Sequence, residues 1–246
     1  MSFKNKNVVV TGGAKGIGGS CSKVFHELGA NVCILDIDEK GKEFANDLGG
    51  KSFFVQCDVS KQNQVTKAFA QIVEQMGDID VLVNNAGIQI RGPLEDFKLE
   101  DWNKLLSINL TGAFLVSKSV VKNMIEKRAG KIINICSIQS DLARPSITPY
   151  TASKGGVRNL TRGMATDWGK HNIQINGIAP GYFKTEMTKA LYEDETFDAW
   201  LCNRTPADRW GNPEELVGSL IFLSSEASNY VNGHLVYVDG GMRSCV

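Results

Sequence analysis

Short apolar runs alternate with longer amphipathic stretches along the whole chain. Several of the runs lack polar alternation, which is typical of strands buried on both faces of a parallel sheet. The runs predict strands at Asn7–Thr11, Asn31–Asp36, Ser52–Gln56, Asp80–Val83, Lys131–Cys136, Ile173–Ile178 and Leu235–Val238. The stretches between them predict helices over about 16–29, 39–48, 61–76, 100–127, 152–170 and 213–223. This order predicts a doubly wound α/β fold.

The region between about 181 and 211 departs from this alternation. It is long and irregular, and Gly181, Pro206 and Gly211 separate short helical pieces. Long loops in compact domains often cover substrates, so we expect a substrate lid here, with a plain surface insertion as the alternative. No linker, repeat or low-complexity tract interrupts the chain, and we expect a single domain over residues 1–246.

Composition limits the classes of partner. The 246 residues carry 27 basic and 27 acidic side chains, so the formal net charge is zero. This balance offers no electrostatic footprint for nucleic acid or an anionic membrane, and we expect neither as a partner. No stretch approaches the roughly 18–20 apolar residues that span a bilayer, and no secretory signal is expected. Six scattered cysteines and three distant histidines predict a reduced, cytoplasmic protein without a metal site.

A glycine-rich loop follows the first predicted strand. In TGGAKGIG, residues 11–18, Gly12, Gly16 and Gly18 lead into a helix. Glycine permits a tight turn and lets the backbone and the helix N-terminus approach a pyrophosphate. The spacing differs from the usual dinucleotide fingerprint, so a plain strand-to-helix turn is the alternative for the loop alone. Asp36 ends the second strand, where a carboxylate accepts hydrogen bonds from adenosine ribose hydroxyls. Together the two features predict a dinucleotide site.

Two further loops at strand ends suit the same ligand. Asp58 follows the third strand and suits the adenine edge, with a helix cap as the alternative. Asn84-Asn85-Ala86-Gly87 follows the fourth strand, and its amides and small side chains suit a flat ligand, with a structural turn as the alternative. Ligands of open α/β sheets bind beyond the carboxyl ends of the strands, so we expect both loops at one edge.

A serine, a tyrosine and a lysine follow the fifth strand. Ser137 lies directly after it, and Tyr150 and Lys154 are four residues apart, so they share one helix face. A phenol with a pKa of about 10 is a weak acid–base catalyst at neutral pH, and a nearby ammonium lowers that pKa. A solvated helix pair is the alternative for Tyr150 and Lys154 alone. Their convergence with Ser137 and the dinucleotide loop predicts proton transfer beside a dinucleotide.

These motifs together resemble the short-chain dehydrogenase/reductase family. The stretches that carry the resemblance are residues 11–18, NNAG at 84–87, Asn109 within SINLTG, Ser137, YTASK at 150–154 and APG at 179–181. The resemblance spans essentially the whole chain. It implies a Rossmann-type three-layer sandwich with a seven-stranded parallel sheet, an NAD(P)-dependent oxidoreductase acting on CH–OH groups, and a homotetramer.

The resemblance also implies a role for each matching residue. Tyr150 would be the acid–base catalyst, Ser137 would hydrogen-bond the substrate oxygen, and Lys154 would hold the nicotinamide ribose and tune Tyr150. Asn109 would anchor a water chain that supplies protons. The residues expected against the dinucleotide are Gly12, Lys15, Gly16, Ile17, Gly18, Asp36, Asp58, Val59, Asn85, Ala86, Gly87, Tyr150, Lys154, Pro180, Gly181 and Thr185.

Three longer stretches narrow the resemblance to sugar-acid dehydrogenases within the family. They are residues 134–156, 171–191 and 199–211, and the last two border the expected lid. The resemblance implies reversible oxidation of D-gluconate to 5-keto-D-gluconate. The alternative substrates are another sugar acid, such as 2-deoxygluconate, or a 3-oxoacyl thioester.

A sugar acid needs a cation for its carboxylate, and an arginine fork fits that group best. Arg91, just past the NNAG loop, is the candidate, with an exposed loop charge as the alternative. Gln139 and Arg144 are expected to contact hydroxyl groups, and Ser137 and Tyr150 complete the expected substrate site.

Lys15 and Asp36 favour different dinucleotides. Asp36 repels a 2′-phosphate through like charge and favours NAD, whereas Lys15 partly offsets that repulsion or is a solvated charge. We expect NAD(H) to be preferred, with NADP(H) possible. A non-catalytic dinucleotide sensor would have lost part of the Ser137, Tyr150 and Lys154 set, and a methyltransferase gives no reason for it, so we expect an enzyme.

Overall fold

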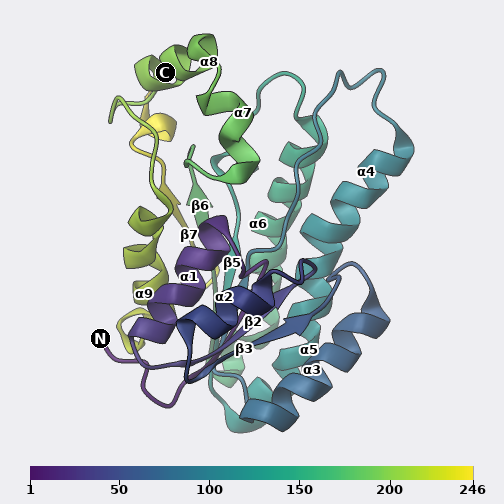
Figure 1. Cartoon of the computed structure of the whole chain (residues 1–246), viewed down its shortest axis with the longest axis vertical. Coiled ribbons are helices and arrows are strands. Elements are labelled where there is room, and N and C mark those ends of the chain that lie inside the picture. Colours follow the sequence, from purple (N-terminus) through teal and green to yellow (C-terminus); the bar gives the residue numbers. More distant parts are fainter. Residues whose placement is uncertain (246) are drawn as a thin grey trace.

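The computed structural model describes residues 1–245 and builds them around one parallel sheet (Figure 1). The strands are β1 (Asn7–Thr11), β2 (Asn31–Asp36), β3 (Ser52–Gln56), β4 (Val81–Asn84), β5 (Gly130–Ile135), β6 (Ile173–Pro180) and β7 (Leu235–Val238). Their spatial order is β3-β2-β1-β4-β5-β6-β7, and every neighbouring pair is parallel. The order reverses between β1 and β4. This confirms the doubly wound, seven-stranded fold that the sequence predicts.

Helices cover both faces of the sheet (Figure 1). They are α1 (Gly16–Glu27), α2 (Gly41–Leu48), α3 (Gln62–Met76), α4 (Leu99–Leu106), α5 (Gly112–Lys127), α6 (Thr148–Trp168), α7 (Lys189–Tyr192), α8 (Glu195–Arg204) and α9 (Val217–Ser224). One face of the sheet carries α1, α2 and α9, and the other carries α3, α5 and α6. The arrangement is the three-layer sandwich expected for this fold.

The strands are apolar without alternation because each of their faces meets a helix layer. On β1, Val8 and Val10 pack in the same cluster as residues of α1 and α9, while Val9 packs in the cluster that contains residues of α3 and α5. All three valines are fully buried. Burial on both faces is the reason that continuous apolar runs, rather than alternating ones, identify these strands.

Most element boundaries agree with the sequence prediction. β1, β2, β3 and β7 begin and end where expected, β4 and β5 are each shifted by one residue, and β6 extends two residues further, through Pro180. α6 begins at Thr148, four residues earlier than expected, with a proline in its first turn. The long helix expected over 100–127 is interrupted by a π-helical turn, Ser107–Thr111, between α4 and α5.

The stretch Leu99–Lys127 is long and apolar enough to cross a membrane by length and mean hydropathy, which the sequence analysis did not expect. Half of its most apolar window is buried inside the protein. The α5 part of it packs on β4 and β5, with Val116, Val120 and Met124 buried in the core. Its apolar side chains therefore serve the packing of the helix layer onto the sheet.

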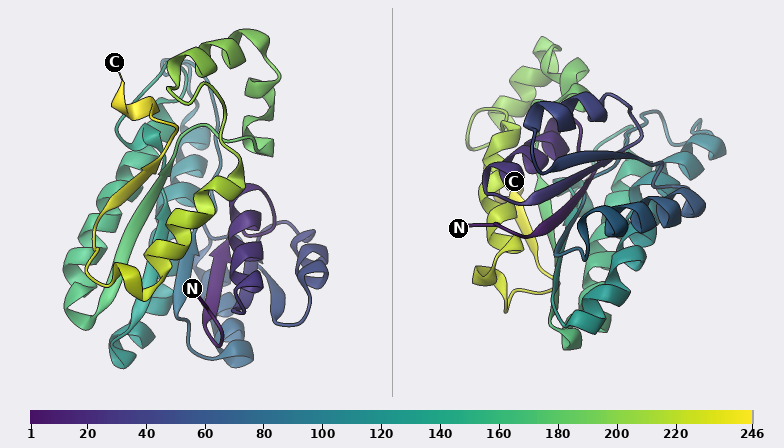
Figure 2. Two further views of the ribbon diagram at one scale, coloured as in Figure 1. Left: turned by 90° about the vertical axis from the view of Figure 1, so that its left-hand side faces the viewer. Right: turned by 60° about the horizontal axis from the view of Figure 1, so that its bottom comes forward.

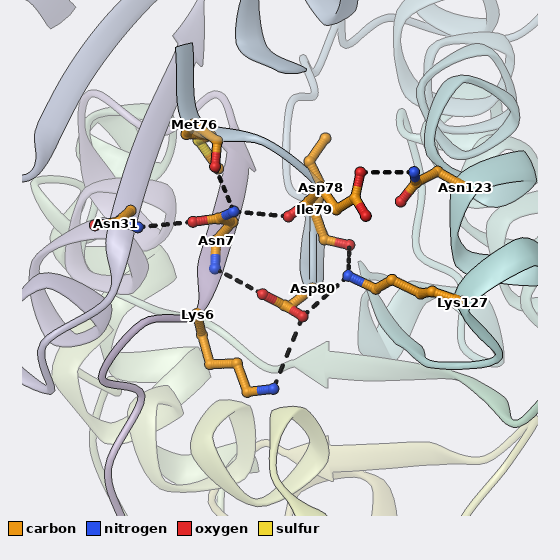
Figure 3. A network of polar contacts seen from close by, with 9 residues as sticks. All are labelled: Lys6, Asn7, Asn31, Met76, Asp78, Ile79, Asp80, Asn123 and Lys127. Atoms are coloured by element: carbon orange, nitrogen blue, oxygen red, sulfur yellow. Dashed lines mark hydrogen bonds and ion pairs between the residues drawn. The ribbon is translucent and has the colours of Figure 1, made fainter. Parts of the chain in front are cut away.

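A polar network fixes the amino ends of β1 and β4 (Figure 3). The Asn7 amide N–H donates to Asp80 Oδ2 at 2.9 Å, and the Asn7 side chain donates to the Met76 carbonyl oxygen at 2.6 Å. Asp80 Oδ1 also pairs with Lys127 Nζ at 3.1 Å and with Lys6 Nζ at 3.8 Å. The network joins β1, β4 and the end of α5 at the edge of the sheet opposite the carboxyl ends of the strands.

The region of the expected lid contains α7 and α8, which stand beyond the carboxyl end of the sheet (Figure 1 and Figure 2, left view). The same two views place the C-terminal end of the chain near α8. Loops from β1, β4, β5 and β6 open at this end of the sheet, so the sequence motifs at the strand ends meet there.

Candidate active site

A cavity of about 420 Å³ opens where the strand order reverses, beyond the carboxyl ends of β1, β2 and β4. Most of the residues expected against the dinucleotide line it: Gly12, Lys15, Gly16, Ile17, Asp36, Asp58, Val59, Asn85, Ala86, Gly87 and Thr185. We call this cavity the dinucleotide groove. Its position is the one at which doubly wound sheets bind their ligands.

Two glycines in and beneath the groove wall, Gly12 and Gly18, lie so close to neighbouring backbone that a side chain would not fit there. Gly12 has a φ of +59°, and a Cβ added to it would lie 2.9 Å from the Ala86 Cα atom. Gly18 lies in the first turn of α1 beneath the groove, where an added Cβ would stand 2.0 Å from the Gly12 carbonyl oxygen. The Asn85 side chain donates to the carbonyl oxygens of Thr11 at 3.0 Å and Gly12 at 2.9 Å, which ties the two loops together. This backbone cradle at a helix N-terminus fits a pyrophosphate.

Asp36 is buried at the far end of the groove and accepts two backbone hydrogen bonds. Its carboxylate takes one from the Ala14 N–H at 3.2 Å and one from the Asp38 N–H at 3.1 Å. Lys15 Nζ lies 3.5 Å from Asp38 Oδ2. The backbone N–H of Lys40 and the Lys15 ammonium lower the pKa of the Asp38 carboxyl. Sequence reasoning weighed Lys15 against Asp36 and missed Asp38, whose position two residues further along the chain was the available signal.

Asp58 both lines the groove and caps the turn that leads into α3. Its Oδ1 accepts from the Ser60 N–H at 2.9 Å and from the Ser60 hydroxyl at 2.7 Å. The sequence offered two interpretations of Asp58, a carboxylate that faces the ligand and a local cap. The same side chain can serve both.

Ser137, Tyr150 and Lys154 line a second cavity, of about 120 Å³, which shares Ile17 and Thr185 with the dinucleotide groove. Pro180 and Gly181 line it as well. We call it the substrate cavity. Ser137 lies after β5, and its Oγ accepts from the Gln139 N–H at 3.1 Å. The structure thus brings Ser137 and the α6 pair, Tyr150 and Lys154, to one wall of the cavity.

Burial dominates the electrostatics of this wall. It raises the pKa of Tyr150 to about 12, against the opposing effect of its hydrogen bond with the Ser137 side chain. Burial also lowers the pKa of Lys154, whose Nζ donates to the Ile135 carbonyl oxygen at 2.7 Å and lies 5.8 Å from the centre of the Tyr150 ring. The expected lowering of the Tyr150 pKa by Lys154 is not found in this structure, and Ser137 is the group that opposes burial.

Asn109 lies in the π-helical turn and is 2% exposed. Its side-chain oxygen accepts from the Ile88 N–H at 2.8 Å, and its amide donates to the Ile88 carbonyl oxygen at 3.0 Å and to Ser153 Oγ at 3.1 Å. A small cavity of about 10 Å³, lined by both Asn109 and Lys154, has room for a single water. Such π turns often mark functional sites, and no local sequence pattern announced this one.

The substrate cavity also holds an amide and a cation. The Gln139 side chain is 7% exposed, and its Oε1 has no hydrogen-bond partner within residues 1–245. Arg144 Nε donates to the Tyr182 hydroxyl at 3.0 Å, and its guanidinium lies 5.3 Å from the centre of the Phe197 ring. Arg144 therefore reaches the cavity from a position fixed by Tyr182 and Phe197 of the expected lid, neither of which the sequence analysis singled out.

Arg91, the cation favoured by the sequence, is exposed and does not line the substrate cavity. Its loop runs beside that of Arg144, because the Gly92 N–H donates to the Ser146 carbonyl oxygen at 3.0 Å. Loss of water around the guanidinium and the positive charge of Arg144 both lower the pKa of Arg91. Of the two arginines, Arg144 lines the substrate cavity and Arg91 lies outside its lining.

No group of three histidine, cysteine, aspartate or glutamate side chains placed to hold a metal occurs in residues 1–245. All six cysteines are free thiols, and burial raises the pKa of Cys136, next to Ser137, to about 11. A thiol with that pKa stays protonated at neutral pH and is a weak nucleophile. The groups that Ser137, Tyr150 and Lys154 present to the cavity are a hydroxyl, a phenol and an ammonium.

Comparisons with known proteins agree with this geometry. Residues 12–243 match a protein-family model described as enoyl-(acyl carrier protein) reductase. The chain is 52% identical over 250 residues to the 5-keto-D-gluconate 5-reductase of Escherichia coli K12, covering 100% of this chain and 98% of that protein. It is 51% identical over 249 residues to the gluconate 5-dehydrogenase of Gluconobacter oxydans, covering 98% and 96%. A crystal structure of a gluconate 5-dehydrogenase from Burkholderia cenocepacia in complex with NADP and tartrate superposes with a TM-score of 0.96 at 47% identity, covering 100% and 98%.

Proposed function

The chain belongs to the short-chain dehydrogenase/reductase family, and we propose that within it the protein interconverts D-gluconate and 5-keto-D-gluconate. Family membership makes it an oxidoreductase that acts on CH–OH groups and binds a nicotinamide dinucleotide. The sugar acid is our proposal, supported by the full-length similarity to enzymes of that name and by the polar groups of the substrate cavity.

The observation that carries the substrate proposal is the pair formed by Gln139 and Arg144. Gln139 presents an amide oxygen that is buried without a partner in the described chain, and Arg144 presents a guanidinium to the same cavity. Leaving such a buried acceptor unpaired costs about 1–3 kcal/mol, which a ligand hydroxyl recovers. A polyhydroxylated acid supplies both that hydroxyl and a carboxylate for the guanidinium.

Four residues of this chain would then manage the proton and the reacting oxygen. Tyr150, with a pKa of about 12, is protonated at neutral pH and can give its proton to the carbonyl oxygen during reduction. Ser137 orients the same oxygen, and Lys154 stands behind Tyr150 with the water-sized cavity and Asn109 beyond it. When bound, the nicotinamide supplies or accepts the hydride, while the protein orients the two reactants.

We propose NAD(H) as the preferred dinucleotide. The Asp36 carboxylate, held by two backbone N–H groups, suits ribose hydroxyls and repels a 2′-phosphate. Lys15 is paired with Asp38 and offsets that repulsion less than a free ammonium would. Replacing Asp36→Ala should raise the ratio of kcat/KM for NADPH to that for NADH. An unmoved ratio would remove Asp36 from its assigned role.

The substrate is tested with a panel of ketones run with both NADH and NADPH. We expect rapid turnover of 5-keto-D-gluconate and little turnover of simple ketones. Comparable or better rates on a 3-oxoacyl thioester or a 2-deoxygluconate derivative would overturn the substrate and leave the reaction class in place. Replacing Tyr150→Phe separates an enzyme from a sensor, because dinucleotide binding should survive while turnover collapses.

The carboxylate contact has its own matched pair of variants. Arg144→Gln should raise KM for sugar acids by about tenfold or more while leaving the dinucleotide affinity unchanged, since a buried charge-assisted contact contributes about 1.5–3 kcal/mol. Arg91→Gln serves as the comparison on the neighbouring loop, and we expect a smaller effect because Arg91 lies outside the cavity lining. A larger rise in KM for Arg91→Gln would return the role to the residue that the sequence favoured.

We also propose a cytoplasmic homotetramer. Large apolar side chains remain on the surface of the single chain, with Phe114 on α5, Phe222 on α9 and Tyr230 before β7 exposed by 44%, 37% and 104%. Burial between copies would remove such side chains from water. Six free thiols suit a reducing compartment. Light scattering on the purified protein that returned a monomer mass would overturn the tetramer.

A further inference from the structure

The last turn of the chain lies between the expected lid and the loop that carries Ser137. This C-terminal turn comprises residues 242–245, and we call Ser137–Asp141 the serine loop. Met242 is 5% exposed and packs in one apolar cluster with Ile138 of the serine loop and Leu201 of α8. The Met242 side chain therefore shares one apolar cluster with the serine loop and with α8, although Ile138 and Leu201 are more than 60 residues apart along the chain.

The serine loop is fastened to α6 next to the catalytic lysine. Ser140 Oγ donates to the carbonyl oxygen of Lys154 at 2.9 Å. The Asp141 carboxylate pairs with Arg158, one helical turn beyond Lys154. These two contacts set the position of Ser137 relative to the helix that bears Tyr150 and Lys154.

The same aspartate joins the serine loop to the C-terminal segment. Asp141 Oδ2 accepts from the Tyr237 hydroxyl, and Arg243 Nε lies 3.2 Å from it. The Arg243 guanidinium also stacks 4.2 Å from the centre of the Tyr237 ring. The Asp141 side chain is only 14% exposed, so its charge pairs lie in a medium that screens them less than bulk water does.

Arg204 joins the C-terminal turn to the lid. It ends α8, and its guanidinium donates to the carbonyl oxygens of Met242 and Cys245, both at 3.1 Å. The charge-assisted contacts of Arg204 and Arg243 are thus joined by the backbone of the C-terminal turn, and together they form a path from α8 to Asp141. Its far end is the loop that carries the catalytic hydroxyl.

We propose that Asp141, Arg243 and Arg204 are positioning residues that couple the lid to Ser137 through the C-terminal turn. None of the three is assigned a role in binding or chemistry above. Their effect is on where the Ser137 hydroxyl stands relative to Tyr150, and a displacement of about 1 Å at a reacting group can cost on the order of 100-fold in rate. The proposal rests on the reaction class and not on the identity of the sugar acid.

The experiment is a double-mutant cycle with Arg204→Gln, Arg243→Gln and the double variant. We expect each single variant to lower kcat by about tenfold while the dinucleotide Kd stays unchanged, because neither residue touches the groove. If the two residues act through the same contacts, kcat of the double variant falls no lower than kcat of the more impaired single variant. Arg162→Gln is the matched control, since Arg162 lies exposed on α6 without an ion pair in residues 1–245.

A second measurement separates positioning from a loss of folded protein. The contact with Ser137 lowers the pKa of Tyr150, so displacing Ser137 raises that pKa and shifts the pH–rate profile for alcohol oxidation to higher pH. Arg243→Lys keeps the positive charge on a half-exposed side chain. Compared with Arg243→Gln, it should have a higher kcat and a smaller shift of the pH–rate profile.

Two outcomes would overturn the proposal. One is a double variant whose loss in kcat equals the product of the two single losses, which means that Arg204 and Arg243 act independently. The other is a fall in kcat that follows the loss of folded protein in thermal melts, with an unshifted pH profile. The assay uses whichever ketone the wild-type protein reduces fastest, so a wrong substrate assignment leaves the cycle interpretable.

Discussion

Replacing Gly18→Ala tests whether the glycine loop is shaped by backbone contact. Gly18 lies in the first turn of α1 and its φ is not in the left-handed region, so alanine fits its backbone conformation. Its added Cβ would stand 2.0 Å from the Gly12 carbonyl oxygen and 2.4 Å from Asn85 Nδ2. The substitution therefore changes one thing, the space between α1 and the loop that walls the dinucleotide groove.

The size of the effect follows from that distance. Ordinary contact begins at 3.4 Å, so the Gly12 peptide has to retreat by about 1.4 Å. Overpacking of this kind costs about 1–3 kcal/mol. The displaced peptide is also the one that faces the expected pyrophosphate, and a loss of similar size in binding raises Kd by about 5- to 150-fold. We expect a lower Tm and weaker dinucleotide binding together.

The assay compares Gly18→Ala with Gly19→Ala, one residue further along the same helix. At Gly19 the nearest atoms to an added Cβ belong to Ala14 and lie 3.5 Å away, which is ordinary contact. Dinucleotide Kd by titration calorimetry and Tm by differential scanning fluorimetry should separate the two variants. Equal Kd values for Gly18→Ala and the wild-type protein would refute the close-approach reasoning, because the loop would then have absorbed the clash elsewhere.

Three further changes act on stability alone. Gly218→Ala in α9 adds a Cβ that meets nothing within 4 Å, so the gain in helix propensity of about 0.5–1 kcal/mol should raise Tm by a few degrees, and a lower Tm would contradict it. Asp80→Ala leaves the Asn7 N–H without its acceptor and Lys127 without its carboxylate partner, so it should lower the free energy of unfolding in urea by about 1–3 kcal/mol. An unchanged value would make the network of Figure 3 incidental. Lys131 has a pKa lowered by burial from 10.5 to about 8, so between these values the unfolded chain binds more protons and this group adds stability as pH rises. Lys131→Met should flatten that rise between pH 8 and 10, and an identical slope would contradict the assignment.

The sequence was sufficient for the fold because the sheet is buried on both faces. Continuous apolar runs then mark strands to within one or two residues. One of the errors falls where a polar residue belongs to a strand. Asn84 ends β4 because its buried amide donates to Ser117 and Asn134 on neighbouring elements, at 2.9 and 2.8 Å. The π-helical turn around Asn109 was missed because its extra residue is stabilised by contacts with Ile88 and α6 rather than by a local pattern.

The groove was predictable for the same topological reason. Parallel strands bring their carboxyl ends to one edge, so residues that follow strands meet without any knowledge of side-chain contacts. The contacts that join loops across long separations were not predictable. Arg144 reaches the substrate cavity because Tyr182 and Phe197 of the expected lid fix its position. That pairing leaves no trace in local spacing, whereas Asp38, which holds Lys15, follows Asp36 by only two residues.

The surroundings of Tyr150 show what spacing alone leaves open. The interval of four residues places Tyr150 and Lys154 on one face of α6, as expected, yet the Lys154 ammonium donates to the carbonyl oxygen of Ile135, the last residue of β5. Ser137, which opposes the effect of burial on Tyr150, stands just beyond that same strand. The end of β5 therefore orients the lysine and supplies the hydroxyl that lowers the phenol's pKa. We therefore expect the acid strength of Tyr150 to depend on the fit between β5 and α6, and contacts that hold the serine loop against α6 to affect the chemistry without touching the substrate.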